Sequence, residues 1–184
     1  YAPWVDFGTA VLSAYGTMAA LMARQQTGKG QMVEGALLAT ALHFFNFHLI
    51  EQDLRGTDRT AIGNRSPYAG PADCVQTKDG WRSVRVNGDP LFKRWAKLMG
   101  EDTWLSDPRF ADDLKRGEHG EILSQRTADW AAQYTMEEAL SILGDARIPA
   151  GPVYSPAQAL ADPHIQAMKY MTPLDFPGLP HPAP

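Results

Sequence analysis

The stretch DCVQTKDGWRSVRV, residues 73–86, is the strongest fold signal in this chain. It consists of two short runs, 73–77 and 82–86, on either side of an Asp79-Gly80 pair. An Asp-Gly turn between two such runs is typical of a β-hairpin. The sequence therefore predicts a small antiparallel sheet at this point.

Helical spacing follows the hairpin, and local signals mark where the helices begin. Pro90 lies at the first position of one predicted helix, and Thr135 with Glu138 forms a capping box at the start of another. The predicted helices cover 91–99, 123–134, 135–143 and 156–160. Residues 148–153 are expected to be extended and to return to the sheet. Together these elements predict a compact α+β unit.

The chain upstream of the hairpin has a different character. Apolar residues at helical spacing predict a helix from Thr9 to about Gln26, with Gly28 as the residue that ends it. An almost wholly apolar helix is expected over 36–50, and such a helix is buried inside something larger. The polar, Gly/Pro-rich stretch 54–73 is typical of an interdomain linker.

Composition narrows the class of protein. The chain has 184 residues, 44% of them hydrophobic and 21% charged, with a formal net charge of −4. No block of Lys and Arg points to nucleic acid or an anionic membrane as a partner, and no apolar run reaches the length that a membrane span requires. Cys74 is the single cysteine, which excludes an internal disulfide and fits a reducing cytoplasm. We therefore expect a cytoplasmic globular protein.

Several short motifs occur in a fixed order along the chain. Asp6 precedes a helix rich in small residues that continues into ALMARQQTGKGQMVE at 20–34. The later motifs are GN at 63–64 before PY at 67–68, DG at 79–80, DPRF at 107–110, and IPAGPV at 148–153 before DPH at 162–164. In this order they resemble the class III CoA-transferase family, which includes formyl-CoA transferase, carnitine CoA-transferase and α-methylacyl-CoA racemase.

The resemblance implies an α+β fragment of an α/β enzyme. Family members are longer and begin with a Rossmann-like half that this chain lacks. The implied domains are the end of the large domain (1–50), a linker (51–72), a small α+β domain with a short antiparallel sheet (73–168) and an extended return linker (169–184). The resemblance also implies an intertwined homodimer that acts on an acyl-CoA and a carboxylic acid, with coenzyme A as part of the substrate and no metal.

Asp6 is the catalytic candidate that the resemblance implies. In the transferases the matching aspartate attacks the acyl-CoA thioester, and CoA then passes through an aspartyl thioester to the acceptor acid. A carboxylate suits this covalent role, and backbone N–H groups at the start of the following helix favour its charged form. The plainer interpretation is that Asp6 is the N-cap of a helix that begins near Thr9.

Two other functions remain open at this stage. In the racemase branch the matching aspartate exchanges the α-proton of a 2-methylacyl-CoA together with a histidine, and no histidine of this chain lies upstream of Asp6. A truncated, non-catalytic module for dimerisation or interaction is the alternative outside enzymology. The activity of the chain by itself is left open.

The remaining candidates carry weaker signals. Arg24 and Lys29 are candidates for CoA phosphate contacts, although a helix end and tight turn are the favoured explanation of the TGKG sequence at 27–30. Gly63, Asn64 and Tyr68 are candidates for the substrate pocket, because family members place this loop near the acyl group; ordinary turn chemistry is the alternative. His43 and His48 lie five residues apart, which does not suit metal ligation on one helical face, so we predict no metal site.

Overall fold

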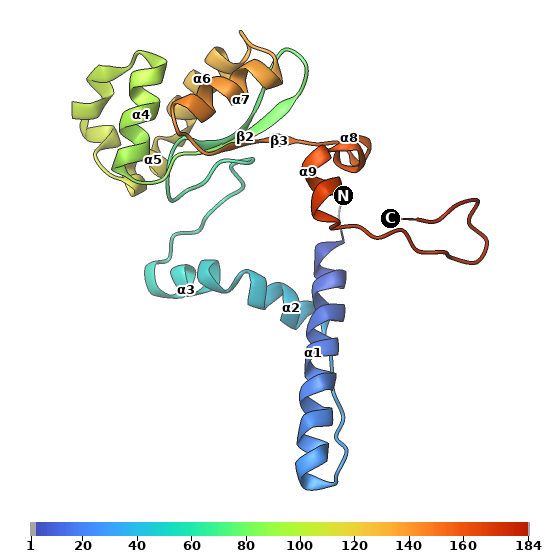
Figure 1. Ribbon diagram of the computed structural model, residues 1–184. Coiled ribbons are helices and arrows are strands. Elements are labelled where there is room, and N and C mark those ends of the chain that lie inside the picture. Colours follow the sequence, from blue (N-terminus) through green and yellow to red (C-terminus); the bar gives the residue numbers. More distant parts are fainter. Residues whose placement is uncertain (1–2, 184) are drawn as a thin grey trace. The chain divides into compact units, whose positions relative to one another are not determined.

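The computed structural model describes residues 3–183. The chain divides into two compact units, Tyr1–Ala61 and Ile62–Pro184. Helices predominate and the single three-stranded sheet of the described residues is antiparallel (Figure 1), so the mixed α+β class predicted from the sequence is confirmed.

The first unit is helical. Its helices are α1 (Trp4–Thr27), α2 (Leu37–Phe44) and α3 (Asn46–Arg55). Gly28 ends α1 in the left-handed conformation, with φ of 69°, as the sequence predicts. Residues 28–36 then run back along α1 without regular secondary structure (Figure 1), and Val33 packs against Gly16 while Gly35 meets the hydroxyl of Ser13.

Two helix boundaries in this unit differ from the prediction. α1 begins at Trp4 rather than near Thr9, and the single helix expected over 36–50 is two helices with a break at Phe45. Both differences share a tertiary cause. The Trp4 ring lies 5.3 Å from that of Phe44 and 6.2 Å from that of Phe45, so the start of α1 and the end of α2 pack on each other.

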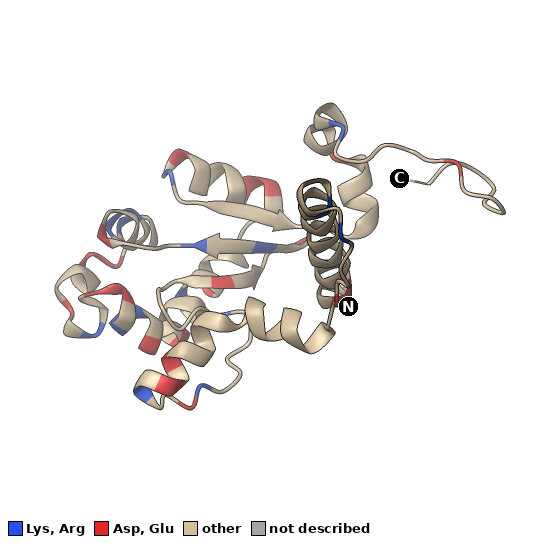
Figure 2. Ribbon diagram, turned by 90° about the horizontal axis from the view of Figure 1, so that it is seen from below, with Lys and Arg blue, Asp and Glu red and all other residues tan. Residues whose placement is uncertain are grey.

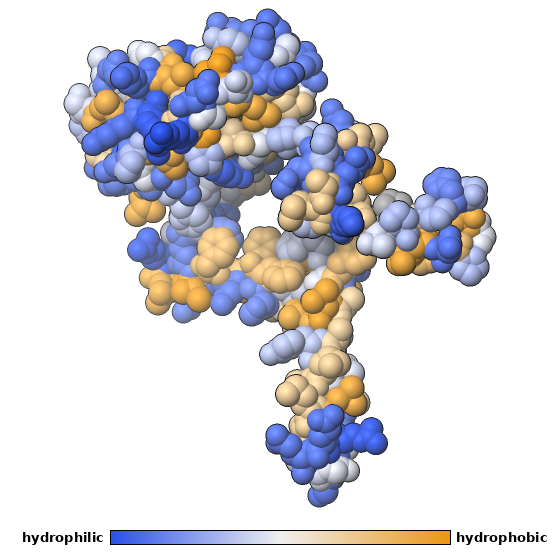
Figure 3. All heavy atoms as spheres, viewed as in Figure 1, coloured by the Kyte–Doolittle hydropathy of each residue, from blue (hydrophilic) through white to orange (hydrophobic). Residues whose placement is uncertain are grey.

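Apolar surface dominates this first unit. Thr40 is the only buried residue among the described residues up to 61, whereas most large apolar side chains of α1, α2 and α3 are exposed within this chain. Figure 2 shows few charged residues on α1 and α2, and Figure 3 shows apolar side chains along them. Contrary to the expectation from the sequence, α1 is long and apolar enough to cross a membrane by length and composition. A core helix of a soluble protein passes the same test, so this property does not assign a membrane location.

The second unit contains the sheet. Its elements are β1 (Ala72–Gln76), β2 (Trp81–Arg85), α4 (Asp89–Met99), the 3₁₀ helices η1 (Asp102–Ser106) and η2 (Pro108–Phe110), α5 (Asp113–Glu118), α6 (Gly120–Ala131), α7 (Met136–Asp145), β3 (Ala150–Val153), α8 (Pro156–Ala161) and α9 (Pro163–Met168). The predicted hairpin is confirmed, with Cys74 opposite Ser83. β3 pairs antiparallel with β2, as expected for the extended segment 148–153.

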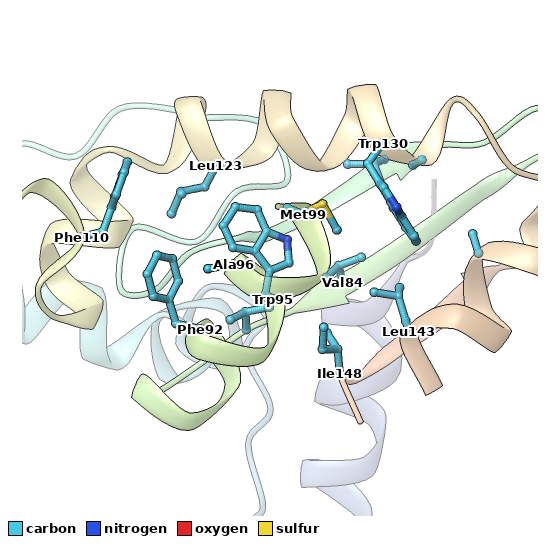
Figure 4. Packing of buried hydrophobic residues seen from close by; sticks show 14 residues of the cluster. Val84, Phe92, Trp95, Ala96, Met99, Phe110, Leu123, Trp130, Leu143 and Ile148 are labelled. Atoms are coloured by element: carbon cyan, nitrogen blue, oxygen red, sulfur yellow. The ribbon is translucent and has the colours of Figure 1, made fainter. Parts of the chain in front are cut away.

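The helices of this unit pack against the sheet around one core. Val84 of β2, Trp95 of α4, Leu123 of α6 and Leu143 of α7 are almost fully buried and point toward one another (Figure 4). Trp95 stacks on Phe92 with ring centroids 5.6 Å apart. Burial of such large apolar side chains is the main favourable contribution to folding.

The two ends of the stretch expected to be a linker, 51–72, belong to the two units of the structure. Residues 51–55 complete α3, whereas 69–72 are buried in the second unit. There Pro67 and Tyr68 approach Gly117 so closely that a Cβ at that position would lie 2.3 Å from the Pro67 carbonyl oxygen. Of the expected return linker, 170–183 holds no helix, and Leu174 and Ala183 form an isolated bridge. The four domain boundaries themselves stay a prediction.

Candidate functional site

Asp6 lies in the first turn of α1 and is exposed. The N-cap position is occupied by Pro3, which contributes no side-chain cap, and the Phe7 N–H donates to the Pro3 carbonyl at 3.1 Å. The interpretation of Asp6 as an N-cap is therefore wrong, because the helix begins before it. In the first turn, the carboxylate lies where the helix dipole and the unpaired N–H groups stabilise negative charge.

The turn that carries Asp6 rests on α2. A Cβ at Gly8 would lie 2.7 Å from Cε2 of Phe44, so the backbone of α1 meets the aromatic ring directly. One step further, Thr9 Oγ1 lies 2.8 Å from Thr40 Oγ1. The contact between the two helices therefore includes residues on both sides of Asp6 in the sequence, since Trp4 also packs on Phe44.

Two pockets open on this unit. The smaller one, of about 190 Å³, is lined by the hydroxyl side chains Thr9, Ser13 and Thr40 together with Glu34 and small residues of 35–39. It begins one helical turn from Asp6. The larger one, of about 730 Å³, lies between α2, α3 and residues 57–61 and is lined by none of the predicted site residues. The smaller pocket is the one that adjoins the turn of Asp6.

The structure does not bring the predicted CoA-contacting residues to Asp6. Arg24 lies in the last turn of α1 and Lys29 just beyond it, and both are exposed. Because an α-helix rises about 1.5 Å per residue, the backbones of Asp6 and Arg24 lie about 27 Å apart along the helix. A role for these two cations in CoA binding stays a prediction.

The predicted pocket residues Gly63, Asn64 and Tyr68 belong to the second unit. Gly63 adopts φ of 72°, which explains why a glycine stands there. Asn64 is exposed, and Tyr68 is half-buried with its backbone N–H donating to Ser66 Oγ at 3.2 Å. The ordinary turn interpretation is thus satisfied at Gly63, and a substrate role for the three residues stays a prediction.

His43 and His48 lie beside aromatic rings, and Cys74 lies in the sheet. The His48 ring lies 4.0 Å from that of Phe47, and His43 neighbours Phe44 at 6.3 Å. Cys74 is half-buried in β1. Among residues 3–183, no group of three or more His, Cys, Asp or Glu side chains is arranged to hold a metal ion.

Sequence reasoning did not identify Gly8, Thr9 and Thr40 as neighbours of the candidate nucleophile. The available signal was Gly8 itself, because a glycine inside a helix often marks a close approach of another segment. The segment that approaches is α2, far along the chain: Thr40, which contacts Thr9, lies 31 residues after it. The spacing of residues within one helix does not reveal such a contact.

Known proteins resemble this chain over nearly its whole length. The curated relatives include the succinyl-CoA–D-citramalate CoA-transferase of Chloroflexus aurantiacus, which is 33% identical over 95% of this chain and 44% of the relative. The succinyl-CoA:mesaconate CoA-transferase of Haloarcula hispanica is 31% identical over 94% of this chain and 43% of the relative. The chain thus spans less than half the length of these relatives.

Solved structures share the fold. A CaiB/BaiF family protein from Brucella suis superimposes with a TM-score of 0.72 at 24% identity, covering 98% of this chain and 50% of that protein. A Mycobacterium tuberculosis protein superimposes with a TM-score of 0.75 at 19% identity, covering 95% and 45%. The profile of the family described as CoA-transferase family III matches residues 1–184. The chain therefore belongs to CoA-transferase family III.

Proposed function

We propose that this chain is part of an enzyme that moves CoA between an acyl-CoA thioester and a carboxylic acid, with Asp6 as the nucleophile. The observation that carries the proposal is the position of Asp6, exposed in the first turn of α1 in a member of this family. The names of the relatives support succinyl-CoA as a donor and a small di-acid as an acceptor. The substrates and a homodimeric assembly, in which the apolar faces of α1 to α3 are covered, are part of the proposal.

The chemistry proceeds by exchanges at the carbonyl carbons of the donor, of Asp6 and of the acceptor. The Asp6 carboxylate attacks the thioester carbonyl and expels CoA thiolate. The donor acyl group and Asp6 are then joined in a mixed anhydride. The thiolate then attacks the aspartyl carbonyl, releases the donor acid as a carboxylate and leaves an aspartyl-CoA thioester. The acceptor carboxylate repeats the two steps in reverse order and regenerates Asp6. Each step forms one acyl bond and breaks another, so no redox partner or metal is needed to balance it.

The helix supports this chemistry electrostatically. Each attack places negative charge on a carbonyl oxygen, and backbone N–H groups of the first turn of a helix are suited to stabilise such an oxyanion. Pro3 supplies no side-chain cap to the N–H groups of this first turn, which leaves them available to a ligand. This arrangement fits acyl transfer at Asp6.

The decisive experiment measures the intact mass of the complete natural protein and of its Asp6→Asn variant. We expect an acyl or CoA adduct on Asp6 after incubation with succinyl-CoA, located by peptide mapping. Asp6→Asn should lose the adduct and at least about 10³-fold in kcat, as expected for removal of a nucleophile. Asp53→Asn makes the same change on α3 and should leave the adduct and kcat unchanged.

Other outcomes would support the alternatives. Exchange of the α-proton of a 2-methylacyl-CoA in D₂O, with no adduct on Asp6, would identify a racemase. No adduct and no exchange by the complete protein would contradict the proposal and favour a non-catalytic module.

A further inference from the structure

The turn that carries Asp6 is joined to α2 by a partly buried hydroxyl contact. Thr9 Oγ1 lies 2.8 Å from the Val5 carbonyl oxygen and 2.8 Å from Thr40 Oγ1. A carbonyl has no proton to give and a hydroxyl has one, so Thr9 donates to Val5 and Thr40 donates to Thr9. Val5 directly precedes Asp6, and the chain of hydrogen bonds therefore ends at the backbone of the nucleophile.

Thr40 is placed to hold this contact firmly. It is 4% exposed, whereas the other described residues of the first unit are at least partly exposed. Its methyl group would lie 3.4 Å from a Cβ at Gly8, so α2 also touches α1 beyond the hydroxyl. This partly buried hydrogen bond and the packing beside it restrict the rotation of α1 relative to α2.

Two other threonines of α1 show what is special about Thr9. Thr17 donates to the Ser13 carbonyl at 2.8 Å and Thr27 to the Ala23 carbonyl at 2.9 Å, and both of these bonds are exposed. Such a bond to the residue four positions earlier is ordinary for a helical threonine. Only at Thr9, among the described threonines of α1, does a side chain of another helix join the bond.

We propose that Thr40 is a positioning residue for Asp6, acting through the Thr9 hydroxyl and the Val5 carbonyl. The inference rests on the proposed function of Asp6. Attack on a thioester carbonyl requires the carboxylate oxygen and the carbonyl carbon to be held in one geometry, and a misplacement of about 1 Å costs about 10²-fold in rate. Thr40 supplies this constraint through its contact with Thr9.

The test is made in the complete natural protein with Thr40→Val, Thr40→Ala and Thr40→Ser. We expect Thr40→Val and Thr40→Ala to lower kcat about tenfold or more, with KM for the acyl-CoA unchanged, and Thr40→Ser to restore the wild-type rate. Thr17→Val is the matched control, because it makes the same substitution on α1, the helix that carries Asp6, at a threonine whose hydroxyl bonds only within that helix. It should leave kcat unchanged.

A second readout separates positioning from folding. The final amount of Asp6 adduct counts competent sites, and the rate constant of its formation reports positioning. In Thr40→Ala we expect a smaller rate constant of adduct formation and an unchanged final amount of adduct. If Thr40→Val fails to fold, the Ala and Ser variants decide, since both are smaller than Thr and create no clash.

The outcomes distinguish this inference from the proposed function. A fully active Asp6→Asn would overturn the proposed function, and with it the role of Thr40. An inactive Asp6→Asn together with a wild-type rate in Thr40→Ala would overturn the inference alone. Equal losses in Thr40→Ser and Thr40→Ala would also overturn it, because the methyl group rather than the hydroxyl would then carry the effect.

Discussion

Arg116 shows how a buried guanidinium is accommodated in the second unit. It donates to the Phe110 carbonyl at 2.8 Å and forms ion pairs with Asp113 at 2.9 Å and Asp89 at 2.8 Å. Its guanidinium also lies 4.2 Å from the Phe92 ring centroid. Charge, hydrogen bonding and packing are therefore all satisfied at this residue.

Arg82 is equally buried but has a poorer environment. Its hydrogen bond from Nη1 to the Ala139 carbonyl is long, at 3.5 Å, and Nε and Nη2 have no hydrogen-bond partner among the described residues. The guanidinium lies 4.7 Å from the Trp130 ring centroid. Burial lowers the pKa of Arg82 to about 10. At neutral pH the group is charged in both the folded and unfolded states, so the cost of burying the charge is fully present.

These two arginines predict opposite mutational effects. Arg116→Met should lower the free energy of unfolding by about 2–3 kcal/mol, because it leaves the buried Phe110 carbonyl and two carboxylates without their partner. Arg82→Met should leave it unchanged or raise it by up to about 2 kcal/mol, since the buried charge is removed and the Trp130 contact is kept. Urea unfolding of the two variants measures both. A loss in Arg82→Met as large as that in Arg116→Met would contradict the argument.

At the scale of elements, α7 illustrates a helix whose start is determined locally. Thr135 N–H donates to the Glu138 carboxylate at 2.9 Å, and the Glu138 N–H donates to Thr135 Oγ1 at 3.3 Å. The hairpin contributes a further hydrogen bond, because the Asp79 carboxylate accepts from the Met136 N–H at 2.7 Å. Side chains thus satisfy the N–H groups of Thr135, Met136 and Glu138.

The capping box predicts a pH-dependent stability. The hydrogen bonds from the Thr135 backbone and then from its side chain hold the pKa of Glu138 below its usual 4.5. Since the folded-state pKa is the lower one, the carboxylate stabilises the fold above the unfolded pKa, and this contribution is lost as pH falls through the folded pKa. We expect Glu138→Gln to be less stable than wild type at pH 7 and the gap to close in acid, as measured by urea unfolding at several pH values.

Glu137→Gln is the control for this prediction. It removes one negative charge from the same turn of α7 but leaves the capping box of Thr135 and Glu138 intact. Its stability at pH 7 should therefore lie closer to wild type than that of Glu138→Gln. A gap that persists undiminished in acid would show that the capping carboxylate is not its source.

At the scale of the whole molecule, the two units differ in what holds them together. The second unit encloses a continuous core of aromatic and aliphatic side chains (Figure 4). The described part of the first unit buries Thr40 alone, and its helices present apolar faces (Figure 3). Burial of apolar surface is the main source of folding free energy, so the first unit has far less of this stabilisation within the chain than the second unit has.

This contrast predicts how the units behave when separated. A fragment of residues 62–184 should show a cooperative urea transition by circular dichroism, because its core lies wholly within it. A fragment of residues 1–61 should show a broad change without a cooperative transition, since isolated helices are marginally stable in water. A sharp transition in the 1–61 fragment would contradict the second expectation.

The elements that the sequence predicted correctly are those with local causes. The hairpin turn is held by the Thr77 hydroxyl, which contacts the Asp79 carboxylate and the Gly80 carbonyl. Thr135 and Glu138 determine the start of α7, and Gly28 determines the end of α1. Each involves groups a few residues apart, which interact through short-range hydrogen bonds or backbone preferences. Spacing along the chain is sufficient to recognise them.

Contacts between distant residues decided the rest. The start of α1 at Trp4 and the break at Phe45 depend on aromatic packing between α1 and α2. At the candidate site, the sequence by itself identified Asp6 through its resemblance to a family. Only the tertiary structure placed it inside the first turn of α1 and showed that Gly8 and Thr9 of the same helix contact α2. The physical reason is that a hydroxyl contact between two helices depends on how they pack, and the residue spacing within either helix alone does not determine that packing.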